Sequence, residues 1–254
     1  MVRLQISSSK IRGVDPGMTP LFYQNVSPIT FARHGAMRLR TPLDFRFASA
    51  ANAVPLTLSE IPLAAQWYPV AFTPEARPRP LAILGLRDGE NLFVDGKGCW
   101  REGAYVPSYI RRYPFLLAQE GEMIALCVDD QPEVLSGTSG TPLFEDEAPS
   151  AILDSAMAFC RSAQAAERAT IPFIERLLDL DLLESRTAVV DVPDGAKVSL
   201  SGFLTIDEAR FRALSDEVFL DLRRRGWLAA IYAQIQATLN WGRLADRLGD
   251  RQAA

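Results

Sequence analysis

The densest group of chemically capable side chains lies in residues 105–115, which read YVPSYIRRYPF. Tyr105, Tyr109 and Tyr113 are four residues apart, so one or two helical turns would place their rings on one face. Aromatic rings provide a large contact area and have few bonds to immobilise on binding. This spacing predicts a recognition surface. The alternative is a core-facing helix whose phenols bond to the backbone.

Two adjacent arginines, Arg111 and Arg112, accompany these tyrosines, and Trp100 precedes them. A guanidinium group can hold a carboxylate or a phosphate with two parallel hydrogen bonds. The segment therefore favours a binding protein whose ligand is a peptide, a protein or an anionic small molecule. The alternative is that the arginine stems cover apolar surface while their charged ends remain in water.

The chain contains one histidine, His34, which is the natural candidate for acid/base chemistry near neutral pH. A second hypothesis is therefore an enzyme of unrecognised type. It would use His34 and a carboxylate such as Asp129 as acid and base, and Arg111 and Arg112 would bind an anionic substrate. The alternative is an ordinary hydrogen-bonding histidine, and no catalytic residue is assigned.

Metal and cofactor sites find little support in the sequence. One histidine excludes every site that needs two imidazoles from a single chain. Cys99, Cys127 and Cys160 are far apart, and no glycine-rich nucleotide motif or nucleophile elbow occurs. We therefore expect no metal and no cofactor. Three separated cysteines are typical of reduced thiols, which predicts a cytoplasmic protein.

Three weaker alternatives remain. Ser139 could join His34 and Asp129 or Asp130 in a hydrolase triad, although nothing in the spacing selects these residues. The acidic run at 145–147 could serve acid/base chemistry or bind a hard cation, but it is more typical of a solvated linker. The three arginines at 223–225 could meet an anionic partner, but they precede a glycine, where positive charge favours the end of a helix.

Proline usage indicates which elements position these groups. Fifteen of the seventeen prolines lie at or before residue 149, so the first part of the chain cannot contain many long helices. Apolar runs there predict strands at Leu81–Arg87, Asn91–Asp95 and Met123–Asp129. Leu58–Ala65 is expected to form a short helix, with Thr57 or Ser59 available to cap it.

After residue 149 the apolar residues follow a helical period up to about residue 178, which predicts two helices or one long kinked helix. Thr187–Val192 and Lys197–Leu204 then have the pattern of two strands around a turn. Strands that return so late most simply join the earlier sheet, which favours one domain over two. Thr205 and Glu208 have the spacing of a capping box for the next helix.

The last helix should bury an apolar stripe. Its expected members are Trp227 or Leu228 with Ile231, Ile235 and Leu239. Gln234, Gln236 and Asn240 would then face away from the core. A third hypothesis makes this helix the interface of a homodimer.

These patterns predict an α+β fold. An antiparallel or mixed twisted sheet would come from about residues 20–145 and 187–204, and helices from about 149–185 and 205–248 would pack on it. Residues 1–17 are expected to be a flexible extension, and 18–254 a single domain. The composition, 48% hydrophobic and 23% charged, is that of a globular protein.

Charge and hydropathy exclude two classes of partner. With 27 basic and 31 acidic residues the net charge is −4, which gives no basic field for nucleic acid. The N-terminal residues lack the apolar run of a secretory signal, and no helical segment approaches the ~20 apolar residues that cross a bilayer. We therefore expect neither nucleic-acid binding nor membrane insertion.

Several segments together resemble the SapC family, a bacterial group named from surface-layer protein gene clusters. The resemblance covers about residues 18–247 and is strongest over Leu84–Asp95 and Tyr105–Phe115. Further matching segments are His34, Phe22–Val26, Phe45–Ala48, Val54–Leu56, Trp67–Phe72, Leu200–Phe203 and Ile231–Ala233.

The resemblance implies an accessory role near surface-layer, outer-membrane receptor and flavin-dependent halogenase-like genes, and it assigns no reaction. Relatives tend to carry an acidic, glycine-containing segment where this chain has Thr138–Pro142. If a ligand binds there, this chain is expected to bind a different one.

Overall fold

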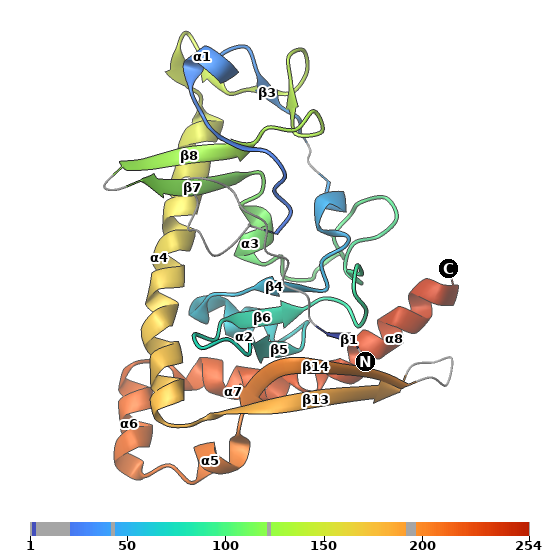
Figure 1. Ribbon diagram of the computed structural model, residues 1–254, viewed down its shortest axis with the longest axis vertical. Coiled ribbons are helices and arrows are strands. Elements are labelled where there is room, and N and C mark those ends of the chain that lie inside the picture. The colour runs from blue at the N-terminus through green and yellow to red at the C-terminus, as the bar shows by residue number, and fades with distance from the viewer. Residues whose placement is uncertain (1, 4–20, 42–43, 121–122, 192–196, 254) are drawn as a thin grey trace. The chain divides into compact units, whose positions relative to one another are not determined.

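The computed structural model describes the chain except residues 1, 4–20, 42–43, 121–122, 192–196 and 254 (Figure 1). The chain forms two compact units. Unit 1 takes the described residues of 1–5, 48–107 and 166–254, and unit 2 takes those of 6–47 and 108–165. No single boundary divides the chain, and one domain over 18–254 stays a prediction. The expected extension over 1–17 falls outside the described residues except for Val2 and Arg3.

Unit 1 is built on a mixed sheet. Its strands are β1 (Val2–Arg3), β4 (Ala53–Pro55), β5 (Val70–Phe72), β6 (Pro80–Ile83), β13 (Leu183–Asp191) and β14 (Lys197–Ile206). They follow the order β1-β14-β5-β6-β4, and β13 pairs with β14. Only the β1–β14 pair is parallel among these described strands. Leu204 lies opposite Phe72, so the late strands join the early sheet as predicted.

Two predicted strands of unit 1 are corrected. β6 ends at Ile83 instead of Arg87, and Asn91–Asp95 forms a turn with one isolated bridge, Val94 to Trp100. The cause is the buried Asn91 side chain, which donates to the Ala48 carbonyl (3.0 Å) and accepts from the Phe93 amide (2.9 Å). Asparagine bonds of this kind turn the backbone away from a sheet ladder.

The short helix predicted at Leu58–Ala65 is confirmed as η2 (Leu58–Glu60) followed by α2 (Ile61–Ala64). Glu60 Oε2 accepts from both the amide and the hydroxyl of Thr57, each at 2.9 Å. This reciprocal capping satisfies a backbone donor that the helix start leaves unpaired.

The apolar period after residue 149 forms one continuous helix, α4 (Ala151–Asp179), although Pro172 lies inside it. Its residues up to 165 belong to unit 2 and the remainder to unit 1. In unit 1, Phe173 is fully buried and packs edge to face on Trp227 with ring centroids 5.7 Å apart. Burial of a phenylalanine of this kind stabilises the fold by about 1.5–3 kcal/mol.

Four helices complete unit 1: α5 (Glu208–Arg212), α6 (Asp216–Arg224), α7 (Leu228–Ala237) and α8 (Asn240–Ala253). The capping box predicted at Thr205 and Glu208 is wrong, because β14 continues to Ile206. The N-cap of α5 is Asp207, whose Oδ1 accepts from the amides of Ala209 and Arg210, each at 3.0 Å.

The apolar stripe predicted for the C-terminal helix is also corrected. Gln234 and Asn240 are buried, whereas Leu239 has 77% of its surface exposed. Gln234 Nε2 donates to the Val70 carbonyl (3.0 Å) and its Oε1 accepts from the Ile206 amide (3.2 Å). Gln234 therefore meets backbone groups of the sheet instead of facing away from the core, whereas Gln236 is exposed as predicted.

Unit 2 contains small antiparallel sheets. The strands β2 (Val26–Pro28), β8 (Met123–Asp129) and β7 (Phe115–Glu120) form one sheet in this order, with β8 as predicted. A second sheet has the order β10 (Thr141–Pro142), β3 (Arg38–Leu39) and β9 (Leu135–Ser136). β11 (Phe144–Glu145) pairs with β12 (Ala148–Pro149). The short helices nearby are α1 (Phe31–His34), η1 (Arg46–Ala48) and α3 (Ser108–Arg111).

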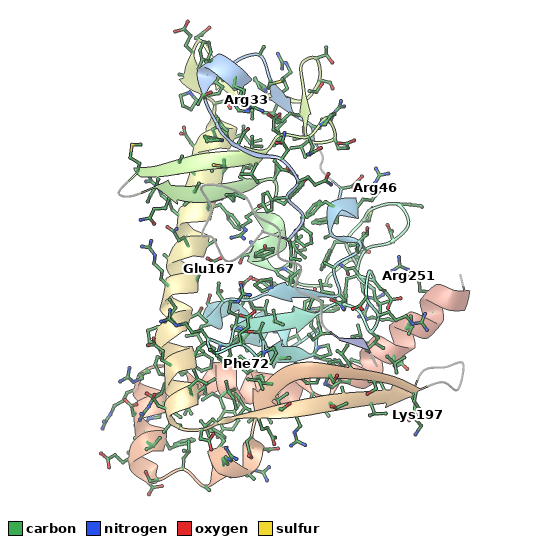
Figure 2. The ribbon with its side chains drawn as sticks, in the orientation of Figure 1. Arg33, Arg46, Phe72, Glu167, Lys197 and Arg251 are labelled. Atoms are coloured by element: carbon green, nitrogen blue, oxygen red, sulfur yellow. The ribbon has the colours of Figure 1, made fainter. Side chains whose placement is uncertain are left out.

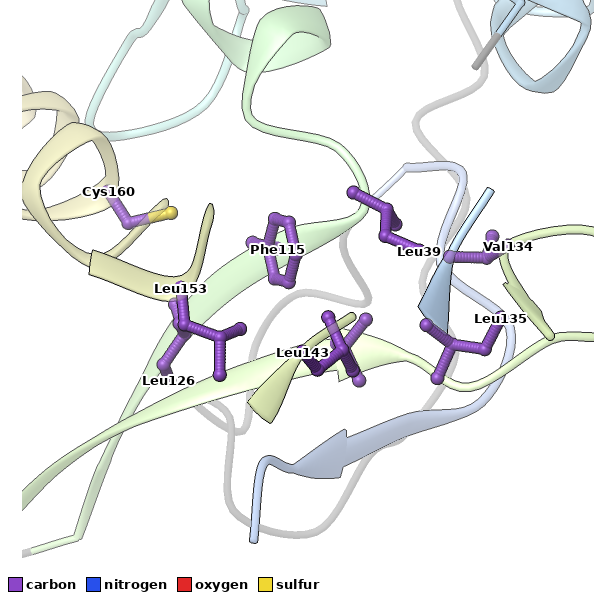
Figure 3. Packing of buried hydrophobic residues seen from close by; sticks show 9 residues of the cluster. Leu39, Phe115, Leu126, Val134, Leu135, Leu143, Leu153 and Cys160 are labelled. Carbon is purple, nitrogen blue, oxygen red and sulfur yellow. The ribbon is translucent and has the colours of Figure 1, made fainter. Parts of the chain in front are cut away.

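A compact apolar core holds unit 2 together (Figure 3). Phe115 from β7 and Leu126 from β8 pack with Leu153 and Cys160 from the first part of α4. Leu39, Val128, Val134, Leu135 and Leu143 complete the cluster. The described helices occur together with sheets whose strand pairs are antiparallel apart from β1–β14, which confirms the α+β class.

Candidate functional site

The aromatic and basic segment 105–115 does not form the predicted helix face. α3 spans only Ser108–Arg111, and Tyr105 belongs to unit 1 whereas Tyr109 and Tyr113 belong to unit 2. Prolines at 107 and 114 bracket α3. Because proline has no amide hydrogen and disfavours a helical residue before it, a longer helix cannot form.

The three phenols all have hydrogen-bond partners within the protein. Tyr105 donates to Glu60 Oε1 (2.8 Å), and the Tyr109 oxygen accepts from the Leu21 amide (2.8 Å). Tyr113 donates to Asp129 Oδ2 (3.0 Å), and burial followed by the Asp129 charge raises its pKa. These bonds match the alternative interpretation, in which the phenols support the scaffold.

The two arginines of the segment differ in exposure. Arg112 is half-buried, and its guanidinium carbon lies 4.1 Å from the centre of the Tyr109 ring. Arg111 is exposed, and its guanidinium carbon lies 5.3 Å from the ring centre of Phe159 on α4. A cation over an aromatic face is attracted by the ring quadrupole, so both guanidinium groups are held in place.

His34 is fully buried at the end of α1. Its Nδ1 accepts from the Thr30 amide (3.3 Å), which would otherwise be unpaired at the start of the helix. Its Nε2 lies 3.4 Å from Ser27 Oγ and 3.8 Å from Asp130 Oδ2. Burial is the main cause that lowers its pKa, and the Asp130 charge opposes this shift.

The orientation of the ring determines what His34 can do. Because Nδ1 accepts a hydrogen bond, the neutral ring carries its proton on Nε2 and donates toward Ser27. A hydrolase triad needs the opposite arrangement, with a carboxylate on Nδ1–H and the serine on the free Nε2 lone pair. Ser27 Oγ in turn points to Asp130 Oδ2 (3.5 Å). The geometry therefore does not activate Ser27, and Ser139 bonds to Ser136 instead of His34.

The carboxylate named in the enzyme hypothesis, Asp129, is fully buried. Its Oδ1 accepts from the amides of Gln24 (3.0 Å) and Asn25 (2.7 Å), in addition to the Tyr113 bond on Oδ2. Three donors on one buried carboxylate anchor the segment before β2 to the end of β8. The acid beside His34 is Asp130, which also receives two hydrogen bonds from Arg33 (2.9 and 2.6 Å).

Trp100 lies in an aromatic cluster of unit 1. It is buried and stacks on Phe93 with centroids 6.1 Å apart, and Phe93 meets Tyr68 edge to face at 4.5 Å. The Tyr68 hydroxyl donates to the Tyr105 carbonyl, and burial raises the pKa of Tyr68. The guanidinium carbon of Arg247 lies 4.4 Å from the Phe93 centroid.

The predicted binding residues thus fall into two groups. Trp100 and Tyr105 lie in unit 1, and His34, Tyr109, Arg111, Arg112 and Tyr113 lie in unit 2. Sequence reasoning missed Arg247, although the four-residue spacing of Arg243, Arg247 and Arg251 on a C-terminal helix was visible. It also missed Ser27, for which no local signal exists because its partner comes from tertiary packing.

Two classes of feature are absent from the described residues. They contain no group of three or more histidine, cysteine or acidic side chains placed to hold a metal ion. Within the same part of the chain, no helix combines the length and apolar character needed to span a bilayer.

Comparison with known proteins identifies one relationship. No curated protein and no solved structure matches the chain. A family model described as SapC matches residues 29–244, most of the 254 residues. This range contains both groups of predicted binding residues. The chain therefore belongs to the SapC family.

Proposed function

We propose that this SapC-family chain is a non-catalytic binding protein that recognises an anionic group on a peptide, a protein or a small molecule. Arg111 makes the contact with the anion, and Arg112 and the tyrosines beside it support the surface. The remaining predicted residues, His34 and Trp100, belong to the scaffold on which this surface is built.

The position of Arg111 carries this proposal. Its side chain is exposed, and its guanidinium group rests on Phe159, which projects from the long helix α4 of the same unit. A guanidinium group that is already held on a ring loses little freedom when it binds, and its planar fork has the geometry to bond a carboxylate or phosphate at two points.

The acid/base groups of unit 2 support binding over catalysis. His34 directs its proton toward Ser27, and Asp129 is fully buried and accepts from two amides and a phenol. A general base needs a free lone pair within reach of a substrate proton. Neither group offers one in this geometry.

The cellular setting is part of the proposal. Cys99, Cys127 and Cys160 form no disulfide within the described chain, in keeping with a cytoplasmic protein. The family resemblance suggests an envelope- or uptake-related pathway. A protein or peptide partner, an anionic metabolite and a homodimer all remain compatible with this role.

The test compares what the protein and its variants retain when they are purified from the native host. Wild type and Arg111→Gln are isolated at low salt, and bound proteins and small molecules are measured by mass spectrometry. We expect a specific molecule on wild type to fall about tenfold or more on Arg111→Gln. The free energy of unfolding should change by no more than about 0.5 kcal/mol, as for an exposed residue.

Arg161→Gln is the matched control, because Arg161 is an exposed arginine on α4 two residues beyond Phe159 and projects from another side of the helix. It should retain the ligand. Equal retention by all three proteins, or no specific molecule on wild type, would refute the proposal. A large loss of stability in Arg111→Gln would also refute it, since Arg111 would then belong to the scaffold.

A further inference from the structure

Four arginines gather around the aromatic cluster of unit 1. Arg243, Arg247 and Arg251 follow one another at four-residue intervals along α8, so they lie along one side of this helix. Arg101 follows Trp100 in the chain, and its amide donates to the Phe93 carbonyl (2.8 Å). Arg251 projects from α8 and donates to the Asn91 carbonyl at 2.8 Å (Figure 2).

Arg247 lies at the centre of this group. Its guanidinium carbon is 4.4 Å from the Phe93 ring centre, and Nη1 is buried without a hydrogen-bond acceptor among the described residues. Arg101 and Arg243 are close enough to influence its protonation, and both are exposed. The backbone of Arg101 is bonded to Phe93, Arg247 lies on the Phe93 ring, and Arg243 lies one turn before Arg247 on α8 with its Nη1 donating to Asn240 Oδ1 (3.0 Å).

The described residues place no carboxylate in a direct ion pair with these three arginines, Arg101, Arg243 and Arg247. Burial, followed by the Arg101 charge, lowers the pKa of Arg247, and Asp250 only partly opposes this effect. Arg176 and Arg225 in the same unit are different, because both pair with Asp221.

Like charges at short range destabilise a folded protein unless an opposite charge accompanies them. We propose that Arg101, Arg243 and Arg247 form a binding site for a small oxyanion, such as the carboxylate or phosphate group of a metabolite. Arg247 supplies a guanidinium group fixed on Phe93, and the exposed Arg101 and Arg243 close around the anion with forked hydrogen bonds. The site lies in unit 1 and does not depend on Arg111.

The test measures binding of two defined oxyanions, inorganic phosphate and citrate, to the full chain. Titration calorimetry and thermal unfolding are performed at constant ionic strength, with sodium chloride as the reference salt. We expect at least one oxyanion to bind and raise the unfolding temperature, since a ligand that binds only the folded state stabilises it. The preferred anion distinguishes a phosphate-bearing from a carboxylate-bearing ligand.

The variant Arg101→Gln with Arg243→Gln leaves Arg247 and its aromatic packing intact. Its Kd for the preferred oxyanion should rise about tenfold or more. Without the oxyanion it should unfold at the same temperature as wild type or higher, because two like charges are removed. The control Arg223→Gln with Arg224→Gln makes the same charge change at exposed positions of α6 and should bind as wild type does.

Three results would overturn this site: no binding of either oxyanion, equal loss of binding in both double variants, or marked destabilisation confined to Arg101→Gln with Arg243→Gln. The variant Arg111→Gln distinguishes this unit 1 site from the Arg111 surface of the proposed function. If Arg111→Gln abolishes oxyanion binding and the Arg101 and Arg243 variant does not, the unit 1 site is refuted and the Arg111 surface is supported.

Discussion

A single backbone amide determines the chemistry of His34. The sequence shows a lone histidine between arginines, a pattern that allows an acid/base role. In the structure, the Thr30 amide donates to Nδ1, and the ring proton is thereby confined to Nε2 beside Ser27. The side chain that could have been a base serves instead to complete the start of α1.

The first prediction concerns the titration of His34. Because burial lowers its pKa, the imidazole should titrate below the ordinary value of about 6.5. NMR can measure this without ambiguity, since the chain has only one histidine. The ring nitrogen shifts should also show the proton on Nε2. A pKa at or above the ordinary value would contradict the description.

The sign of the accompanying stability change follows from linkage. The unfolded state binds a proton at His34 more readily than the folded state, so stability falls as pH drops below about 6.5 and continues to fall until the folded-state pKa is passed. Urea unfolding between pH 7.5 and 5.5 measures this contribution of His34 to the unfolding free energy. In the variant His34→Asn the contribution should be absent.

At the scale of the element, α7 and its junction with α8 show how a polar face becomes an internal contact. Gln234 bonds to Val70 of β5 and to Ile206 at the end of β14, and Asn240 Nδ2 donates to the carbonyls of Ala65 (2.7 Å) and Tyr68 (2.9 Å). These side chains satisfy backbone groups that would otherwise be buried without partners.

The second prediction tests this contact. Gln234→Met keeps the length of the side chain but leaves a buried amide and a buried carbonyl unpaired, so it should cost about 2–4 kcal/mol of unfolding free energy. Gln236→Met is the matched control on the same helix, because Gln236 is exposed. It should change stability by about 0.5 kcal/mol or less in urea unfolding. Similar losses in both variants would contradict the assigned bonds.

At the scale of the molecule, α4 is a long helix that contributes residues to both units. Its first part packs in the core of unit 2, and its last turns bury Phe173 and Leu177 in unit 1. The prediction of one domain over residues 18–254 therefore means that the two units should unfold together. Unfolding of α4 should remove packing from both units.

The third prediction breaks α4 at an exposed position, Ala165. Ala165→Pro removes one helical hydrogen bond and should cost about 3 kcal/mol or more, whereas Ala165→Gly should cost about 1 kcal/mol. If the chain unfolds as one domain, hydrogen exchange should accelerate in β7–β8 and in β13–β14 together. Acceleration confined to one of these sheets would show that the units unfold independently.

Much of the fold was accessible from local sequence patterns. The boundaries of β8, the short helix before residue 65 and the return of late strands to the sheet follow from apolar periodicity and from prolines, which act on their immediate neighbours. The tyrosines would share one face only if the segment 105–115 were helical. Pro107 and Pro114 outweigh the four-residue spacing and limit α3 to Ser108–Arg111, and these prolines are a local signal that the sequence contained.

The sequence by itself determined the α+β class, the family and the residue types available for recognition, because these depend on composition, periodicity and motif. Only the tertiary structure decided which polar groups already have hydrogen-bond partners inside the protein. Asp130 and Ser27 lie about a hundred residues apart in the chain yet both face His34, and Gln234 reaches backbone from two distant strands. Hydrogen bonds between distant segments depend on how the chain packs, and no local pattern encodes them.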